Sequence, residues 1–155
     1  MKRILSLLCL MLMLSVVAFA KGNEMPQYDI TGAGSGNEGM LLVKVFVYCK
    51  KVTDQDLKRA ALHGVVFRGC SGNNIGAKQP AMAPAESEAS HSEFCNGFFA
   101  VQGECQNYAS IIAGSYERVK TSKGVKSGAI VQVDKKALRK ALEKAGVVRS
   151  LSAGF

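Results

Sequence analysis

The stretch Met40–Cys49, MLLVKVFVYC, is the longest run of strand-forming residues downstream of the apolar N-terminus. It contains three valines and two aromatic residues, types that favour a pleated and packed surface. Both faces of the strand that it predicts are apolar, with Lys44 as the single exception. Because a strand that is apolar on both faces belongs inside a sheet, we predict that it is the central strand of the domain.

A helix and a second strand are predicted directly after the central strand. Thr53 is a good N-cap residue with Asp56 three positions later, and Gly64 is placed to end the helix. The apolar run 65–68, VVFR, then predicts a short strand. A strand, a helix and a strand within so few residues predict a βαβ unit with parallel strands and a right-handed crossover.

The region 69–90 is rich in small and polar residues and predicts a long, mobile loop. Ser90 is then expected to cap a helix whose apolar face contains Phe94 and Phe98 and which ends near Gly103. The loop therefore separates the predicted βαβ unit from the C-terminal half of the domain.

The C-terminal part predicts a hairpin followed by a helix. A polar edge strand at 114–121, a turn at 122–124 and a second strand at 125–133 form the hairpin. Asp134 is expected to cap the last helix and Gly146 to end it. The apolar stripe of this helix consists of Leu138, Ala141, Leu142 and Ala145. The order β-α-β-loop-α-β-β-α predicts an α/β or α+β domain, a two-layer sandwich of a mixed four-stranded sheet and about three helices.

The first residues have the pattern of a signal peptide. Lys2 and Arg3 precede an apolar run, and Ala18-Phe19-Ala20 fits a cleavage site. The predicted organisation is a signal peptide at 1–20, a flexible glycine-rich segment at 21–39 and a single domain at 40–155. Within the glycine-rich segment, a short edge strand at 28–31 stays open. We therefore expect an exported protein, located in the periplasm or at the outer membrane, with no transmembrane segment in the mature chain.

Four cysteines follow the predicted signal, and disulfides persist in exported proteins. Cys49 ends the first strand of the predicted βαβ unit and Cys70 follows the second, so parallel neighbouring strands would bring them within bridging distance. Cys95 and Cys105 are close enough in sequence to close a short loop. We predict the bridges Cys49–Cys70 and Cys95–Cys105, and the two other pairings of the four thiols stay open.

Cys70 and Ser71 follow the predicted second strand and slightly resemble a nucleophile turn, with His63 or His91 as the base. The spacing is not G-x-S-x-G, and no helix follows that would lower the thiol pKa. The glycine pattern at 34–39 precedes a strand, the reverse of a dinucleotide site, and therefore predicts a flexible turn. We expect no metal ion and no cofactor.

Positive charge is concentrated in the last third of the chain. From Ser115 onward there are ten basic and three acidic residues, in a chain whose formal net charge is +8. The cations predicted to bind a partner crowd one face of the last helix and are Lys135, Lys136, Arg139 and Lys140. Such a field attracts acidic proteins or anionic glycans. The predicted signal and the shortage of exposed aromatic residues argue against nucleic acid.

Three segments carry a resemblance to known proteins: Tyr28-Asp29-Ile30-Thr31-Gly32, Arg68-Gly69 and Tyr116-Glu117-Arg118-Val119. With them, the mature chain resembles small exported proteins of unknown function from Bacteroides-type bacteria. The resemblance implies a Gram-negative envelope setting and assigns no functional residue.

The sequence as a whole predicts a non-catalytic, envelope-associated domain that binds a protein or an anionic glycan. A partner or a second copy of the chain is expected to cover the apolar sheet face that the helices leave open. The alternative is a small exported enzyme that uses Cys70 or Ser71 as its nucleophile.

Overall fold

The computed structural model describes residues 24–72 and 78–150, so the predicted signal peptide lies outside the described residues. Six strands form one sheet with the order β3-β1-β2-β6-β4, and β5 pairs with β6 as well. The strands are β1 (Tyr28–Ser35), β2 (Met40–Val47), β3 (Ser71–Gly72), β4 (Ala109–Ile111), β5 (Glu117–Thr121) and β6 (Gly124–Asp134). The sheet is mixed, because β1 and β3 are parallel while the other pairs are antiparallel.

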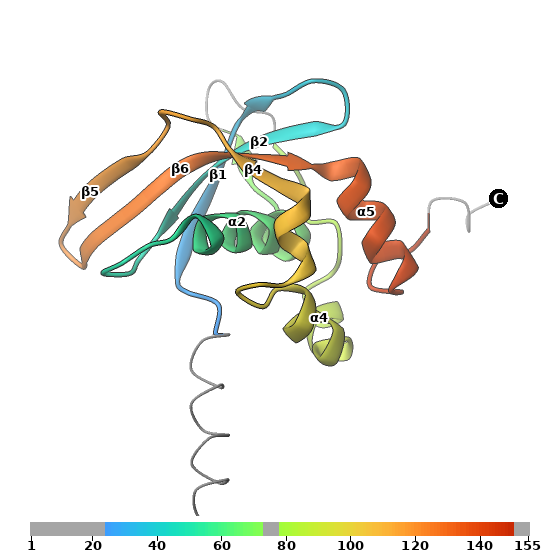
Figure 1. The fold of residues 1–155 in the computed structure, drawn as a ribbon. Helices are drawn as coiled ribbons and strands as arrows, with labels where there is room; N and C mark the ends of the chain where they lie inside the picture. The colour runs from blue at the N-terminus through green and yellow to red at the C-terminus, as the bar shows by residue number, and fades with distance from the viewer. Residues whose placement is uncertain (1–23, 73–77, 151–155) are drawn as a thin grey trace, which may run out of the picture.

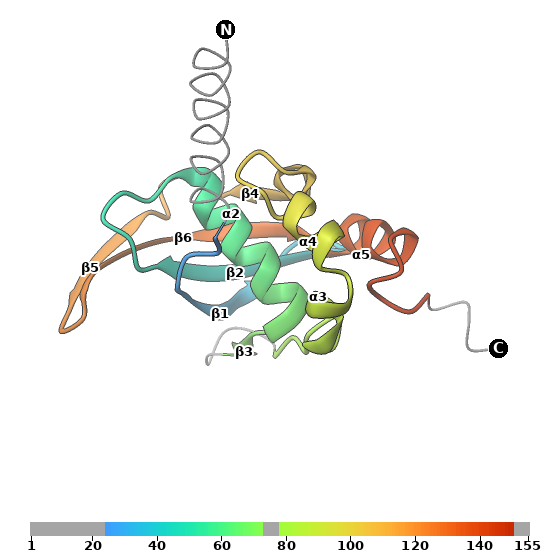
Figure 2. The same cartoon turned by 90° about the horizontal axis from the view of Figure 1, so that it is seen from below.

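The helices gather on one face of the sheet, with α2 running across it (Figures 1 and 2). The α-helices are α2 (Asp54–His63), α3 (Glu86–Ser90), α4 (Ser92–Phe98) and α5 (Lys135–Lys144), and Glu104–Tyr108 forms a 3-10 turn, η3. This confirms the predicted α+β class with a mixed sheet, although the sheet has six strands where four were expected. Within the described ranges, no helix has the length and apolar character needed to cross a membrane.

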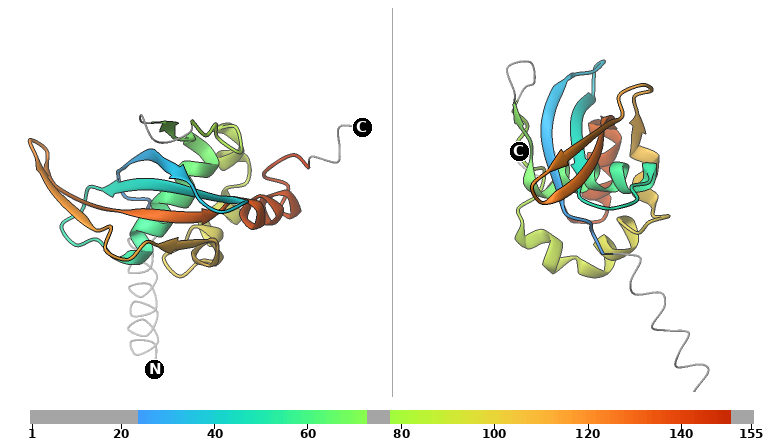
Figure 3. Two further views of the ribbon diagram at one scale, coloured as in Figure 1. Left: turned by 90° about the horizontal axis from the view of Figure 1, so that it is seen from above. Right: turned by 90° about the vertical axis from the view of Figure 1, so that its left-hand side faces the viewer.

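The predicted central strand is confirmed. β2 lies between β1 and β6 and pairs with both along its length. Its odd-numbered residues Leu41, Val43, Val45 and Val47 are buried on the helical face of the sheet, whereas the even-numbered residues are half-buried on the opposite face. Figure 3 shows this opposite face of the sheet lying in front of α2. The sequence prediction of two apolar faces therefore holds, but in the described part of the chain only one of them is covered by helices.

The predicted βαβ unit is wrong, because residues 64–68 do not form a strand. Gly64–Arg68 continues α2 as a π-helical turn, and Gly69, at a φ of 69°, ends it. A short apolar run fits a buried helix as well as a strand, and Val65 and Val66 are fully buried here. Gly64 has a packing role rather than a terminating one, since a Cβ there would lie 2.7 Å from the Ile30 side chain.

The predicted loop at 69–90 contains regular structure on both sides of residues 73–77, which lie outside the described residues. Strand β3 pairs with β1, Cys70 forms an isolated bridge with Gln79, and α3 occupies Glu86–Ser90. Ser90 ends α3 instead of capping the next helix, and its Oγ donates a hydrogen bond to the Glu86 carbonyl oxygen. The next helix, α4, ends at Phe98, several residues before Gly103.

The glycine-rich segment 21–39 also contains more structure than predicted. Its residues 28–35 form β1, which is antiparallel to β2 with a register irregularity between Gly32 and Gly34. The glycines at the end of the segment form the turn of this hairpin, where Gly39 adopts a φ of 84°. The predicted domain boundary at residue 40 is therefore wrong, because β1 is part of the sheet.

The C-terminal predictions agree closely with the structure. β5 and β6 form the expected hairpin, and β4 adds a short strand that the sequence did not indicate. The Ala137 amide donates to Asp134 Oδ1 at 2.8 Å, which caps α5. Gly146, at a φ of 76°, ends the helix in a Schellman motif, with the Val147 amide bonded to the Leu142 carbonyl oxygen at 3.0 Å.

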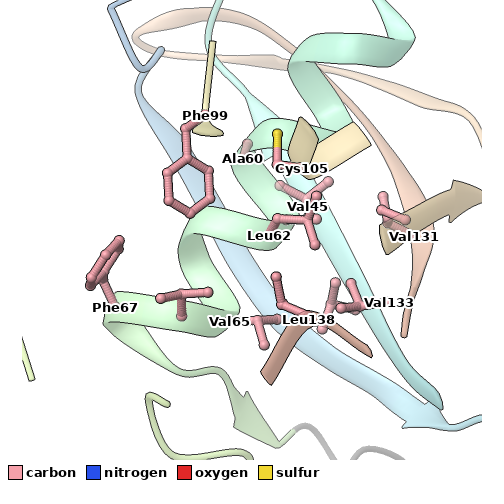
Figure 4. Packing of buried hydrophobic residues seen from close by; sticks show 14 of the residues in the cluster. Val45, Ala60, Leu62, Val65, Phe67, Phe99, Cys105, Val131, Val133 and Leu138 are labelled. Carbon is pink, nitrogen blue, oxygen red and sulfur yellow. The ribbon is translucent and has the colours of Figure 1, made fainter. Parts of the chain in front are cut away.

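The core lies between α2 and the sheet. Leu62 of α2 and Val65 of the π-helical turn that follows it face Val45, Val131 and Val133 of the two central strands (Figure 4). Leu138 of α5 and Cys105 of η3 close the two sides of this layer. Burial of these side chains fixes α2 against β2 and β6, and thereby positions the loops at both ends of the sheet.

Candidate functional site

A hollow of about 410 Å³ lies at the end of the sheet, where β2 stops and the β5–β6 hairpin turns. The charged side chains of its lining are Lys50, Arg118 and Lys123, and no carboxylate belongs to that lining. Tyr48 and Cys49 complete the wall on the β2 side. We call this the basic hollow. Its composition suits an anionic group, because three cations converge on a space large enough for a small ligand.

The sheet register brings the three cations together. Val47 of β2 and Arg118 of β5 both pair with Ser127, one from each side of β6. The chain that leaves β2 through Lys50 therefore runs beside the hairpin. The hairpin closes through a two-residue turn between Thr121 and Gly124, and Gly124 adopts a φ of 118° at the end of this turn. Lys123 is the second residue of the turn and lines the hollow.

No cation of the basic hollow forms an ion pair with a carboxylate within the described ranges. Ion pairs within the described ranges involve Lys44, Arg59, His63, Lys126 and Arg139. None of these belongs to the lining of the hollow. Lys50, Arg118 and Lys123 are all exposed, so their charges are available to a partner.

The carboxylate beside the basic hollow is already occupied. Tyr48 Oη donates to Asp29 Oδ2 at 2.6 Å, and Lys126 Nζ lies 3.0 Å from the same oxygen. The Tyr48 hydrogen bond, followed by Lys126, lowers the pKa of Asp29, so this carboxylate is ionised at neutral pH. Lys126 also lies 4.7 Å from the centre of the Phe46 ring on the open sheet face. Asp29 is therefore engaged mainly by Lys126, and Lys123 is also near enough to lower its pKa, whereas Lys50 and Arg118 have no part in this cluster.

Of the four cations on the last helix that were predicted to bind a partner, two already have partners within the chain. Lys135 Nζ donates to Gln79 Oε1 at 3.1 Å, and Arg139 forms an ion pair with Glu143 at 2.9 Å. Lys136 and Lys140 are exposed. The sequence correctly indicated a basic C-terminal third, and the structure adds a group of three cations at the hairpin end, in the basic hollow.

The structure does not assemble the predicted catalytic group. Cys70 is buried, and burial raises the pKa of its thiol. Ser71 is exposed on β3, and neither residue is hydrogen-bonded to a histidine in the described part of the chain. His91 lies between α3 and α4, and its Nδ1 is 3.1 Å from the Ser87 carbonyl oxygen of α3.

Neither predicted disulfide is formed in the described part of the chain, where Cys49, Cys70, Cys95 and Cys105 are free. The argument for Cys49–Cys70 assumed neighbouring parallel strands, but β1 lies between β2 and β3. Cys49 is exposed beside the basic hollow, while Cys70 is buried at the far edge of the sheet. Cys95 and Cys105 are both buried, and burial raises the pKa of Cys105 to about 11.

His63 belongs instead to a hydrogen-bond chain that links three elements and is buried at its Tyr28 end. Tyr28 Oη of β1 lies 2.7 Å from His63 Nδ1, and Glu88 Oε1 of α3 lies 2.8 Å from Nε2. The Phe67 and Phe99 rings lie 5.2 and 5.4 Å from the imidazole, measured between ring centres. Burial raises the pKa of Tyr28 to about 12, so its hydroxyl stays protonated. Since both ring nitrogens are engaged, His63 has none left to activate a nucleophile.

Sequence reasoning missed Tyr28 and Glu88 as partners of His63. The one available signal was a histidine inside the apolar run 60–67, because a buried imidazole needs hydrogen-bond partners. Their identity depends on contacts across 35 and 25 residues, which no local pattern encodes. The basic hollow was missed for the same reason, since its cations come from separate segments.

Comparisons with known proteins do not assign the chain to a class. It matches no family model, no curated protein and no solved structure. Among residues 24–72 and 78–150, no three side chains of histidine, cysteine, aspartate or glutamate are grouped to hold a metal ion. The functional interpretation therefore depends on the geometry of the chain itself.

Proposed function

We propose that this chain is an exported, non-catalytic domain of the cell envelope that binds an anionic partner, either an acidic protein or an anionic glycan. The basic hollow is the binding site in this proposal. Export is supported by the signal-like pattern of residues 1–20, and the envelope setting by the resemblance to small exported proteins.

The observation that carries the proposal is the convergence of Lys50, Arg118 and Lys123 on one hollow without a lining carboxylate. Holding like charges together is unfavourable, and an anionic ligand removes this repulsion while gaining charge-assisted hydrogen bonds. Arg118 can bind a carboxylate or a sulfate through two parallel N–H donors, whereas the lysines act as point charges. Because the cations are exposed, binding should weaken as salt is added.

Heparin, a sulfated glycan, and poly-glutamate, an acidic polypeptide, are suitable probes for the two partner chemistries. The test variant is Arg118→Ser with Lys123→Ser. The matched control is Lys136→Ser with Lys140→Ser, which removes the same charge from exposed positions on α5. Isothermal titration at several salt concentrations measures affinity and its salt dependence for each protein.

We expect the hollow variant to bind at least one probe roughly tenfold more weakly, as the loss of two charge-assisted contacts implies. We also expect it to show a shallower salt dependence than the unmodified protein, whereas the α5 control should lose far less. Preference for heparin assigns a glycan partner, and preference for poly-glutamate assigns an acidic protein. Equal losses in the two variants, or no binding of either probe, would overturn the proposal.

A further inference from the structure

A second cavity, of about 380 Å³, lies on the helical side of the molecule between the C-terminal end of α2 and the helices α3 and α4. Figure 2 shows α3 and α4 beside that end of α2. His63 forms part of its wall and Glu88 stands at the same wall, with the carboxylate 47% exposed. We call this the Glu88 cavity. It is separate from the basic hollow, with which it shares no lining residue.

The charge around the Glu88 cavity is opposite to that of the basic hollow. No lysine or arginine contributes to its lining, and none occurs in the sequence between Lys78 and Arg118. Two arginines outside the lining contact residues next to the cavity, and both already have partners. Arg59 donates to the Phe99 carbonyl oxygen at 2.7 Å and lies 3.7 Å from Asp56, and Arg68 stacks 4.3 Å from the centre of the Tyr28 ring.

The positions of the protons along the hydrogen-bond chain leave Glu88 with its negative charge. Tyr28 Oη is buried, and its O–H finds its acceptor at His63 Nδ1. The imidazole is then neutral, with its single proton on Nε2 donated to Glu88 Oε1. The reverse arrangement, a charged imidazole that donates to Tyr28, would leave the tyrosine proton without a protein acceptor in a buried place. A neutral His63 orients the carboxylate without neutralising it.

The remaining lining is suited to a short apolar body with a polar head. Met25, Ala85, Ala89 and Phe99 supply apolar surface, and Ser92 and Asn96 supply neutral oxygen atoms. An ammonium group has three N–H donors and no acceptor. One carboxylate and neutral oxygens on the same wall match this need, while the volume lies in the range of small-molecule sites.

We propose that the Glu88 cavity binds a primary ammonium group carried on an apolar stem of four to six carbons. The ammonium pairs with Glu88, and the stem lies against the Phe99 and Met25 side chains. Such a group occurs on free alkylamines and at the end of a lysine side chain of a partner. This inference is independent of the proposed function, because it concerns a different cavity and the opposite ligand charge.

The experiment measures binding by isothermal titration with two probes, n-hexylamine and Nα-acetyl-lysine-N-methylamide. The neutral control ligand is 1-hexanol, which has the same stem without the charge. Glu88→Gln removes the charge while keeping a group that accepts a hydrogen bond from His63. Glu93→Gln is the matched control, since it makes the same change at an exposed position of α4 outside the lining. Ala89→Leu, at an exposed position of α3, fills the cavity without touching the hydrogen-bond chain.

We expect both amines to bind at least tenfold more tightly than hexanol, and Glu88→Gln and Ala89→Leu each to reduce amine affinity at least tenfold. The Glu93→Gln protein should bind as the unmodified protein does. Binding of hexylamine alone assigns free alkylamines, and binding of the lysine derivative as well assigns a lysine side chain. Absence of amine binding, equal affinity for hexanol, or full affinity in the Ala89→Leu protein would overturn the inference.

Discussion

Tyr28 Oη lies 2.7 Å from His63 Nδ1 and joins the first strand of the sheet to the last turn of α2 across 35 residues. The hydrogen bond is buried, and it fixes the imidazole that in turn meets Glu88 on α3. One polar chain therefore ties three elements together within an otherwise apolar region, and each of its members depends on the others for a partner.

Replacing Tyr28 with phenylalanine removes the proton that satisfies His63 Nδ1 while keeping the aromatic ring. We expect the free energy of unfolding to fall by about 1–3 kcal/mol, the usual cost of leaving a buried polar atom unpaired. Denaturant melts measure this loss. Tyr48→Phe is the matched control, because its hydroxyl meets Asp29 in an exposed hydrogen bond, and it should cost less than about 0.5 kcal/mol. Equal losses would show that the buried chain contributes nothing specific.

Gly64 allows α2 to cross β1 at close range. A Cβ at this position would lie 2.7 Å from Ile30 Cδ1 and 3.2 Å from Tyr28 Cε2. We expect Gly64→Ala to lower the free energy of unfolding by about 1–3 kcal/mol through overpacking. Gly97→Ala, in α4, meets no atom within 4 Å and should be neutral or stabilising by up to about 1 kcal/mol. Thermal unfolding of both proteins decides the matter, and destabilisation by the Gly97 change alone would contradict the packing assigned to α2.

The last helix offers a clean contrast between its buried and exposed faces. Leu142 is fully buried, whereas Lys140 is exposed. We expect Leu142→Ala to cost about 2–4 kcal/mol of unfolding free energy, because it leaves a cavity in the core. Lys140→Ala should change it by less than about 0.5 kcal/mol. Similar midpoints and slopes for the two variants in urea would mean that α5 presents a different face to the sheet.

The four cysteines that follow the predicted signal peptide should react with iodoacetamide at different rates. Cys49 is exposed, while burial raises the pKa of Cys70, Cys95 and Cys105. Since the thiolate is the reactive form, Cys49 should be labelled first in the native protein at pH 8, as peptide mass spectrometry would show.

The reaction of Cys105 should also have a displaced pH profile. Its pKa is raised from 9.0 to about 11, so thiolate forms in the folded state only as the pH approaches 11. Labelling of Cys105 should therefore stay slow near pH 9 in the folded protein and become fast after unfolding in guanidinium. Rapid labelling of Cys105 in the folded protein at pH 8 would refute its assigned burial.

The signal-like N-terminus leads to a prediction about processing. We expect cleavage after Ala20, because Ala18-Phe19-Ala20 has small residues at the positions that a signal peptidase reads. Terminal sequencing of the protein from an envelope fraction should begin at Lys21. A protein that still begins at Met1 in the cytoplasm would rule out both the cleavage and the export on which the proposed envelope function depends.

The parts of the fold that local patterns define were predicted well. The valines of Met40–Val47 predict a central strand. Asp134 and Gly146 indicate the two ends of α5. Residues 65–68 show where such reasoning fails. Their apolar side chains can be buried in either secondary structure, so the local pattern does not distinguish a strand from the helical turn that the structure shows.

The functional regions were harder to predict than the fold. Arg118 and Lys123 were counted in the basic third of the chain, but Lys50 joins them only because β2 and β5 flank the same strand. Glu88 lies in a segment whose composition predicted a loop, and its carboxylate is held in place by a hydrogen bond with His63 on another helix. Long-range pairing determined both arrangements, and a single sequence carries no direct record of such pairing.

The position of β6 in the sheet also determines when the fold can be completed. β2 pairs with β6 along its whole length, from Met40 opposite Asp134 to Val47 opposite Ser127, although β6 is one of the last elements of the chain. A nascent chain that lacks residues 124–134 can form the β1–β2 hairpin and α2, but it has no surface on which to close the core. Ordering of the core therefore waits until residues 124–134 have been synthesised, so most of the emerging chain stays open during translation.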